Sequence, residues 1–329
     1  MTRLDELITQ ISREHVYIQT HNFPDPDAIA CAFGMQELLK SRGIASTICY
    51  RGKIDRYSTE KLVEFLGIEI KNLDEDVMST EEDEVILVDA QKGNANIINM
   101  TGDEIICIDH HPIFSECEYR FSDIRSDVGA CASIIASYFV ENNVPFTRNI
   151  ATALTFGIHT DTGNLSRGVS KLDVEMLNAL FDECDQDIIH TLENSNLYFD
   201  DLLAYSKAIS SMKVYDEVTF ANTGSDCPEA LVANVSDFML ALVGVTFSVV
   251  YSRRKDGIKM SVRSELASLD AGKIVNKALT GIGNGGGHAS MAGGFVPFIG
   301  KKAEAELLMV EIQERFLQVI EEEKTRNMV

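Results

Sequence analysis

Two short runs in the first half of the chain are apolar throughout and end in charged side chains. The run "VILVD" ends at Asp89, and the run "IICIDHH" ends at Asp109, His110 and His111. Strands that are apolar on both faces are typical of a buried parallel sheet. Parallel strands need crossover connections, which are usually helical, so these runs predict an α/β fold.

The segments around these runs alternate between strand and helix patterns. A β-rich run over 15–21 precedes a helical pattern over 27–43, and further helical patterns cover 129–143 and 150–163. We therefore expect a parallel sheet with helices on both of its faces.

The second half of the chain has a different pattern. The segment 247–265 predicts a hairpin, because Asp256 and Gly257 form a strong turn signal. A helical pattern over 269–281 then leads into a glycine-rich segment.

This change of pattern predicts two α/β domains with a cleft between them. Typical domain sizes place the boundary near residue 185. We expect a larger domain over 1–187, a helical linker over 188–212 and a smaller domain over 213–329.

The chain is strongly acidic, with 51 acidic and 29 basic residues and a formal net charge of -22. A long nucleic acid needs a basic surface that neutralises many phosphates, so the composition favours a small ligand. No apolar stretch approaches the roughly 20 residues that cross a bilayer, and the start of the chain lacks the pattern of a signal peptide. Seven scattered cysteines fit reduced thiols in the cytoplasm.

Histidine and aspartate residues gather where the predicted strands end. His21 closes the first strand, and Asp25 and Asp27 lie in the turn before the next helix. Loops that follow parallel strands converge at one edge of a sheet, so we expect these side chains near Asp89. Carboxylates and imidazoles without thiolates suit hard divalent ions such as Mn²⁺ or Mg²⁺. Singly, each aspartate could be a helix cap, but the whole set favours a two-metal site.

The later acidic and histidine residues extend this hypothesis. Asp89 could bridge two metal ions, or it could cap a helix. Asp109, His110 and His111 would be costly to bury without metal ions or charge partners, the alternative being a solvated loop. One imidazole can bind a metal while the other faces a substrate, and Asp109 can orient an imidazole. Asp161 could be an ordinary turn residue, although an acidic group is disfavoured at a helix C-terminus.

Gly285, Gly286 and Gly287 precede His288 in the second half of the chain. Successive glycines let backbone N–H groups close around an anion, and His288 can donate to a phosphate. Arg263, in a predicted strand, could bind the same anion with two parallel hydrogen bonds. A flexible turn and a surface ion pair are the alternatives.

The series H-x-x-P-D-x-D, V-D, D-H-H, D-T-G, V-R-S and G-G-G-H resembles the DHH/DHHA1 phosphoesterase family, in the same order and over essentially the whole chain. The resemblance implies a DHH domain that binds two divalent ions, Mn²⁺ or alternatively Mg²⁺, and a DHHA1 domain that binds the substrate. It assigns His21, Asp25 and Asp89 to one ion, and Asp27, Asp89, His110 and Asp161 to the other. It places His111 near the scissile phosphate, with Asp109 beside it. It assigns Arg263, Gly285, Gly286, Gly287 and His288 to substrate binding.

Within the family, the length of the chain most resembles the nanoRNase and pAp-phosphatase group. This implies hydrolysis of short oligoribonucleotides, or of adenosine 3′,5′-bisphosphate, by a water that two metal ions activate. The expected partner is such a small nucleotide, not a long nucleic acid or a membrane, and a homodimer is compatible with it. The alternatives are cleavage of cyclic or linear dinucleotides and a nucleotide-binding regulatory module without turnover. Family II pyrophosphatases resemble only the first half of the chain.

The sequence departs from the family pattern beside the first motif. Pro26 lies where glycine is usual, and Ala30 and Cys31 replace a usual Gly-Ser pair. Proline fixes φ and removes an N–H donor, so we expect the turn to hold metal ions or phosphate differently. Because all acidic and histidine ligands are present, the change bears on substrate preference and rate rather than on metal binding.

Overall fold

The computed structural model describes residues 1–75, 79–94, 96–113, 117–194, 197–266 and 268–327. The chain divides into two compact units, Met1–Asn196 and Leu197–Val329. Each unit has its own six-stranded sheet and its own apolar core. No described helix is long and apolar enough to cross a membrane.

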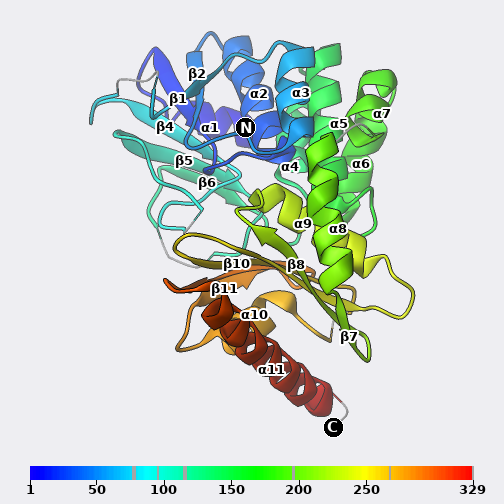
Figure 1. The fold of residues 1–329 in the computed structure, drawn as a ribbon. Coiled ribbons are helices and arrows are strands. Elements are labelled where there is room, and N and C mark those ends of the chain that lie inside the picture. The colour runs from blue at the N-terminus through cyan, green and yellow to red at the C-terminus, as the bar shows by residue number, and fades with distance from the viewer. Residues whose placement is uncertain (76–78, 95, 114–116, 195–196, 267, 328–329) are drawn as a thin grey trace. The chain divides into compact units, whose positions relative to one another are not determined.

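The N-terminal unit is built on a parallel sheet, which confirms the predicted fold class (Figure 1). The strand order is β3-β2-β1-β4-β5-β6, so the first strand of the chain lies inside the sheet. The two apolar runs are β4 and β5, and every residue of β4 is buried. The strands are β1 (His15–Gln19), β2 (Ala45–Tyr50), β3 (Ile70–Asn72), β4 (Glu84–Val88), β5 (Asp103–Asp109) and β6 (Phe121–Ile124).

The helices of this unit share one apolar cluster with one face of the sheet. The expectation of helices on both faces is therefore wrong. Right-handed crossovers place the connections that follow β3 on the opposite face, and these connections contain no helix in their described residues. Ala90, Ile97 and Met100 of these connections cover that face instead. The helices are α1 (Arg3–Ile8), α2 (Pro26–Ser41), α3 (Tyr57–Leu66), α4 (Cys131–Glu141), α5 (Arg148–Thr162), α6 (Lys171–Leu180) and α7 (Gln186–Asn194).

The C-terminal unit contains a mixed sheet in the order β11-β12-β10-β9-β8-β7. Only β8 and β9 pair in parallel. Strands β9 and β10 form the predicted hairpin, and its turn is closed by the Arg254 N–H, which donates to the Gly257 carbonyl at 2.7 Å. The strands are β7 (Lys213–Tyr215), β8 (Val218–Ser225), β9 (Phe247–Arg253), β10 (Gly257–Ser264), β11 (Asn284–Gly287) and β12 (Met291–Pro297).

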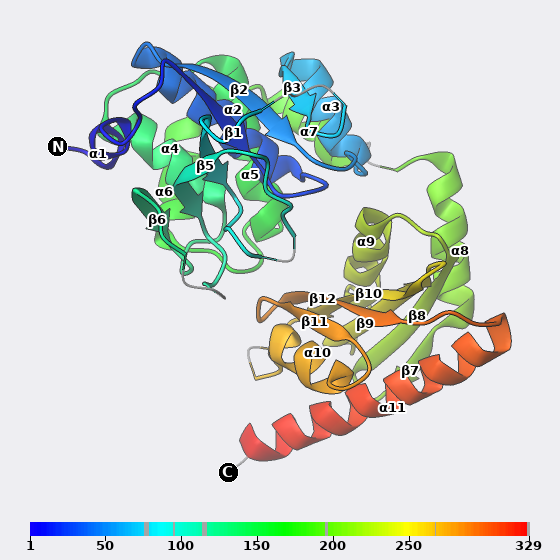
Figure 2. The same ribbon diagram turned by 90° about the vertical axis from the view of Figure 1, so that its left-hand side faces the viewer.

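Helices cover both faces of this second sheet (Figure 2). Helices α8 and α9 pack on one face, where Ala208, Val235 and Val250 are buried together. Helices α10 and α11 pack on the other face. The helical elements are η1 (Phe199–Asp201), α8 (Leu202–Ser211), α9 (Glu229–Leu240), α10 (Ala271–Leu279) and α11 (Lys302–Asn327).

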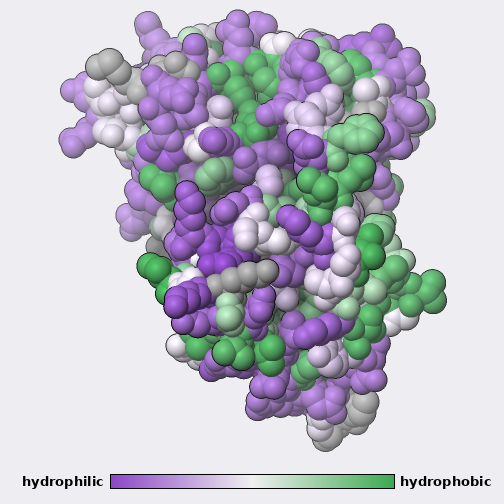
Figure 3. All heavy atoms as spheres, viewed as in Figure 1, coloured by the Kyte–Doolittle hydropathy of each residue, from purple (hydrophilic) through white to green (hydrophobic). Residues whose placement is uncertain are grey.

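Hydrophilic residues cover much of the face shown in Figure 3, and hydrophobic residues appear singly or in small groups. This agrees with the large charged fraction of the sequence. One acidic residue is nevertheless buried at the start of a strand. Glu84 is 2% exposed. Its carboxylate accepts hydrogen bonds from Ser12 N at 2.8 Å, Ser12 Oγ at 2.6 Å and Arg120 Nη1 at 2.6 Å.

We expect Glu84→Ala to lower the free energy of unfolding at neutral pH by about 1–3 kcal/mol, because it leaves these donors unsatisfied. Burial opposes ionisation of Glu84, but the Ser12 and Arg120 donors lower its pKa. A lowered pKa in the folded state stabilises above the ordinary pKa of glutamate, so the difference from wild type should shrink as the pH falls below it. Urea unfolding measures both effects. The exposed Glu82→Ala is the control, and equal losses in the two variants would contradict this account.

Candidate metal centre

The histidine and aspartate residues predicted as metal ligands meet at the carboxyl edge of the N-terminal sheet. They follow β1, β4 and β5 or lie in the last turn of α5. Three overlapping groups each contain ligand atoms within 4.8 Å of one another. The groups are His21, Asp25 and Asp89; Asp27, His110 and Asp161; and Asp89, His110 and His111. The structure thus brings together all six side chains that the motifs assigned to two ions.

Asp89 lies between two imidazoles at the centre of this cluster. Its Oδ2 is 3.5 Å from His21 Nε2, and its Oδ1 is 3.5 Å from His110 Nε2. On the outer sides, His21 Nε2 is 3.8 Å from Asp25 Oδ1, and His110 Nε2 is 3.3 Å from Asp161 Oδ2. The carboxylate of Asp89 is therefore placed to serve both groups.

Backbone carbonyls fix the orientation of both imidazoles. His21 Nδ1 donates to the Asn22 carbonyl at 2.8 Å, and His110 Nδ1 donates to the Val128 carbonyl at 3.2 Å. A carbonyl oxygen only accepts, so Nδ1 carries the proton in each neutral ring. Nε2 then faces the carboxylates with its lone pair, which is the arrangement of a metal-binding histidine.

Asp89 shows two further signs of a site that needs a cation. Its Oδ1 is buried and makes no hydrogen bond within the part of the chain that the structure describes. Its backbone has φ +55°, a left-handed conformation that costs a residue other than glycine free energy. A buried carboxylate oxygen without a donor is expensive unless a cation binds it. The residues present therefore fit divalent ions.

The Asp27 carboxylate is fixed by the N-terminus of α4. It is fully buried, its Oδ2 accepts from Cys131 N at 2.8 Å, and its Oδ1 accepts from Ala132 N at 3.0 Å. The positive end of the helix dipole adds to these bonds. A β-carbon at Gly157 would lie 2.9 Å from Asp27 Oδ1, so the glycine gives the carboxylate its space.

Asp173 supports this arrangement from further away, and sequence reasoning missed it. It is fully buried and accepts from Gly129 N at 3.0 Å, Ser133 Oγ at 2.6 Å and Ser170 Oγ at 2.7 Å. It therefore holds the segment that supplies donors to Asp27 and the carbonyl to His110. The only local signal in the sequence is the capping box formed by Ser170 and Asp173.

Asp109 orients His111. It is fully buried, its Oδ1 accepts from His111 Nδ1 at 2.9 Å, and its Oδ2 accepts from Gln91 Nε2 at 2.7 Å. Asp109 is therefore a positioning residue, whereas the His111 side chain is 27% exposed. Gln91, which also donates to the His111 carbonyl at 2.9 Å, is a second supporting residue that no motif indicated.

The carboxylates and imidazoles of the cluster shift one another's pKa. Burial raises the pKa of Asp27 well above its usual value, and the Asp161 and Asp89 charges raise it further. Burial opposes the charged form of His110, but Asp161 and Asp89 raise its pKa well above the usual value. Burial likewise opposes ionisation of Asp109, but His111 and Gln91 lower its pKa to about 2. The cluster concentrates negative charge that a cation would neutralise.

The first motif also caps α2, so the two interpretations of Asp25 are compatible. Asp25 is the N-cap, and its Oδ1 accepts from Ala28 N at 3.1 Å while lying beside His21. Pro26 occupies the first helical position, where a missing N–H costs nothing and the fixed φ suits the helix.

The predicted substrate-binding residues lie at one end of the second sheet. Arg263 in β10 is paired with Met291 in the neighbouring strand β12. The Met291 carbonyl accepts a hydrogen bond from the His288 N–H at 2.7 Å. Arg263 is 6% exposed, and its Nε donates to Asp237 Oδ1 at 2.7 Å. The alternative for this arginine was a surface ion pair. An ion pair with Asp237 is present, but the Arg263 side chain in it is buried.

The glycine segment is not a loop: Gly285, Gly286 and Gly287 form the edge strand β11, paired with β12. A β-carbon at Gly285 would lie 2.1 Å from Val275 Cγ1, and one at Gly287 would lie 2.5 Å from the Met291 carbonyl oxygen. Close packing therefore accounts for two of the three glycines. Space is open only beside Gly286.

Comparisons with known proteins agree with this architecture. The model of the DHH family N-terminal domain matches residues 15–158, and that of the DHHA1 domain matches residues 214–322. An uncharacterized protein of Methanocaldococcus jannaschii is 32% identical over 317 residues, which cover 93% of this chain and 65% of that protein. The chain thus spans about two thirds of the length of that relative.

Two further proteins resemble the chain. A probable manganese-dependent inorganic pyrophosphatase of Streptococcus thermophilus is 26% identical over 149 residues, covering 45% of this chain and 48% of that protein. The crystal structure of an exopolyphosphatase-related protein from Bacteroides fragilis has the same fold, with a TM-score of 0.71 at 18% identity, covering 96% of this chain and 97% of that chain.

A parallel α/β unit with a cluster of histidine and aspartate ligands, followed by a mixed-sheet unit, defines a class of metal-dependent hydrolases. The chain belongs to the DHH/DHHA1 phosphoesterase family, as its motifs predicted. None of the three relatives above is named as a nanoRNase or a pAp phosphatase, so that finer assignment needs its own argument.

Asp173→Asn should weaken Mn²⁺ binding about 10- to 100-fold, because partners behind the ligands contribute that much to metal affinity. The amide replaces an acceptor with a donor that faces other donors, which displaces the start of α4 and with it Asp27. Titration of Mn²⁺ into metal-stripped protein measures the affinity, and circular dichroism checks that the variant is folded. Glu175→Gln, on the exposed side of the same helix, is the control. An unchanged affinity in a folded Asp173 variant would show that this carboxylate does not position the site.

Proposed function

We propose that this protein is a Mn²⁺-dependent phosphoesterase that hydrolyses small nucleotides, namely short oligoribonucleotides or adenosine 3′,5′-bisphosphate. The observation that carries the proposal is the convergence of two histidines and three further aspartates around Asp89, whose buried Oδ1 has no hydrogen bond within the described residues. Ions bound there would supply Lewis acidity and lower the pKa of a coordinated water.

The protein's own residues would hold the ions and orient the phosphate. His21, Asp25 and Asp89 form one ligand set, and Asp27, Asp89, His110 and Asp161 form the other. The carboxylates that dominate both sets suit Mn²⁺ or Mg²⁺. The relatives named as manganese-dependent support Mn²⁺.

His111 would contact the phosphate directly. Its Nδ1 donates to Asp109, which turns Nε2 to the opposite side of the ring, away from the buried carboxylate. Burial opposes the charged form of His111, but Asp109 and Asp89 raise its pKa. In the doubly protonated ring, Nε2 would donate a proton to a phosphate oxygen or to the leaving oxygen. Arg263, His288 and the N–H group of Gly286 are the candidate anion donors of the C-terminal unit.

An exposed aromatic ring beside the metal ligands favours a nucleotide over an inorganic phosphate. Phe23 lies between His21 and Asp25 and is 54% exposed. Its backbone has φ +55°, and its N–H donates to the Arg51 carbonyl at 3.0 Å. A β-carbon at Gly52 would lie 2.8 Å from the ring, so the phenyl group rests on bare backbone. Strain of this kind is found at functional sites, and a fixed, exposed ring is a surface on which a base can stack.

The likeness to the manganese-dependent pyrophosphatase of Streptococcus thermophilus covers 149 residues, which is 45% of this chain. A pyrophosphate has no group that would use the ring of Phe23. Dinucleotide cleavage stays the alternative, because a dinucleotide carries both a phosphodiester and bases.

Asp27→Ala and His110→Ala should each reduce turnover about a thousandfold or more, because each removes a ligand of the same ion. The assay supplies Mn²⁺ to metal-stripped protein and follows phosphate from adenosine 3′,5′-bisphosphate, mononucleotide from a diribonucleotide, and phosphate from inorganic pyrophosphate. His190→Ala, an exposed histidine on α7, is the control and should behave as wild type. Wild-type turnover in either ligand variant would refute the metal assignment, and turnover of pyrophosphate alone would refute the nucleotide assignment.

Phe23→Ala should raise KM for the diribonucleotide about tenfold, because a stacked base contributes about 1–3 kcal/mol. Turnover of Phe23→Ala at saturating substrate should stay within about twofold of wild type, because Phe23 is not one of the metal ligands. Phe23→Tyr should restore KM, and Phe65→Ala, an exposed phenylalanine on α3, should leave it unchanged. An unchanged KM in Phe23→Ala would remove the support that this ring gives to a nucleotide substrate.

A further inference from the structure

A second candidate binding site lies entirely within the C-terminal unit. A cavity of about 750 Å³ opens beside β8 near Lys213, where the neighbouring strand β7 begins, and α8, β9 and the first half of α11 complete its walls. The geometry points to a site for a nucleotide-sized phosphate monoester, distinct from the metal centre and from the Arg263 end of the sheet. Cavities of this volume are typical of small-molecule sites.

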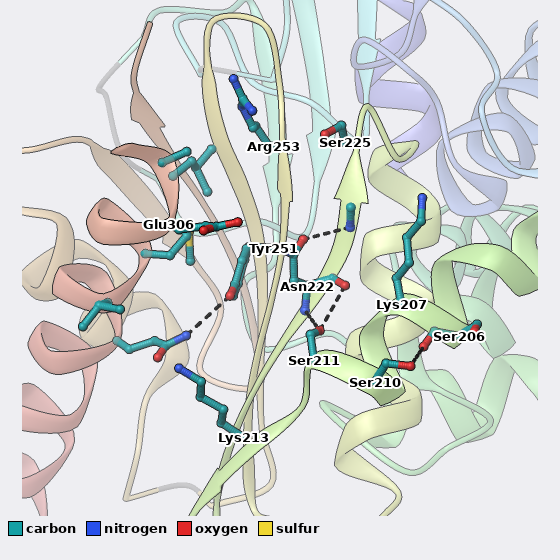
Figure 4. Close-up of a pocket in the computed structure, with 16 residues that line it drawn as sticks. Ser206, Lys207, Ser210, Ser211, Lys213, Asn222, Ser225, Tyr251, Arg253 and Glu306 are labelled. Atoms are coloured by element: carbon teal, nitrogen blue, oxygen red, sulfur yellow. Dashed lines mark hydrogen bonds between the residues drawn. The ribbon is translucent and has the colours of Figure 1, made fainter. Parts of the chain in front are cut away.

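The charge of the cavity is opposite to that of the chain. Lys207, Lys213 and Arg253 line it, and Glu306 is the one acidic residue among its described lining residues. In a chain with 51 acidic and 29 basic residues, a wall chosen at random would carry more acids than bases. None of the three cations forms an ion pair within the described part of the chain. Figure 4 shows Arg253 above, Lys213 below and Lys207 to the right of Asn222.

The floor of the cavity is shaped by a β-bulge. Asn222 pairs with Tyr251 and Ser225 pairs with Arg253, so β8 has one more residue than β9 between these pairs. Gly224 lies in the bulge with φ +96°, and its N–H donates to Asn222 Oδ1 at 2.8 Å. Bulges of this kind often re-aim side chains next to functional sites.

The bulge also makes room for a cation. A β-carbon at Gly224 would lie 2.9 Å from Lys207 Cδ and 3.0 Å from Lys207 Nζ. The lysine side chain therefore lies over the bare backbone of β8, which limits the positions of its ammonium group. Arg253 is anchored in a similar way, because its Nη2 donates to the Gly300 carbonyl at 2.9 Å. Its remaining guanidinium N–H groups are available to an anion.

The opposite wall is suited to an organic group. Ile258, Met309 and Val310 line it, together with the ring of Tyr251, whose hydroxyl accepts from Gln313 Nε2 at 3.4 Å. A cationic side and an apolar, aromatic side together fit a phosphate attached to a ring-bearing body. Inorganic phosphate alone would leave the apolar wall unused.

This cavity and the predicted substrate-binding end lie at opposite ends of one strand. Ile258 and Arg263 are five residues apart in β10, which corresponds to roughly 16 Å along an extended strand. A ligand in the cavity would therefore leave Arg263 untouched.

The test is a binding measurement on the full chain, in EDTA so that no ion occupies the metal centre. Isothermal titration with AMP compares wild type with the Lys207→Ser/Lys213→Ser double variant. Lys171→Ser/Lys273→Ser changes the net charge equally at two exposed lysines outside the cavity, and Arg263→Ala probes the other end of the sheet. Inorganic phosphate and adenosine are titrated in parallel.

We expect the first double variant to weaken AMP binding about tenfold or more, and the Lys171→Ser/Lys273→Ser control to stay within about twofold of wild type. Phosphate should bind more weakly than AMP, and adenosine should bind more weakly still. Absence of AMP binding to wild type, or equal losses in both lysine double variants, would overturn the site. Loss in Arg263→Ala alone would place AMP at the other end of the sheet. Phosphate binding as tightly as AMP would overturn the assignment of an organic ligand.

Discussion

Five aspartates gather at one edge of the N-terminal sheet, and the rest of that unit is arranged around them. Asp27, Asp89 and Asp109 are buried, and buried charges are costly unless donors or cations compensate them. Asp27 has two backbone donors from α4, and Asp109 has His111 and Gln91. Of these three buried aspartates, only Asp89 has a buried oxygen without a donor in the described structure. The need for a cation is therefore concentrated at the carboxylate that the two ligand sets share.

The sequence predicts which side chains meet at this edge, because their positions follow from strand ends. Parallel strands bring their carboxyl ends to one edge of the sheet. An acidic residue directly after "VILV" or "IICI" is therefore expected at that edge. The supporting residues could not be found in this way. Asp173 lies 146 residues after Asp27 in the chain, and its only local signal is an ordinary helix cap. Gly157 looks like any glycine in a helix until the Asp27 carboxylate is seen beside it.

Two misjudged features concern the backbone rather than the site. The helices cover one face of the first sheet because the strand order reverses direction after β3, and that order cannot be read from apolar runs. For the glycine segment, the sequence alone leaves a flexible turn as an alternative, since glycine is common in turns. In the structure, Gly285 and Gly287 let β11 approach Val275 and β12, a role that depends on neighbours distant in sequence. Gly286 is the one glycine of these three with open space beside it.

The net negative charge of this chain opposes the binding of phosphates. Its charge of -22 repels anions at long range, but salt screens such repulsion beyond about 8 Å at physiological ionic strength. The local charges at each site then decide whether an anion binds. The N-terminal unit has carboxylates at its site, so only bound ions can make that site attractive to a phosphate. We propose that the C-terminal unit uses side-chain cations instead, at Arg263 and around the cavity beside β8. Removal of the metal ions should therefore abolish phosphate binding by the first unit and leave anion binding by the second unit unchanged.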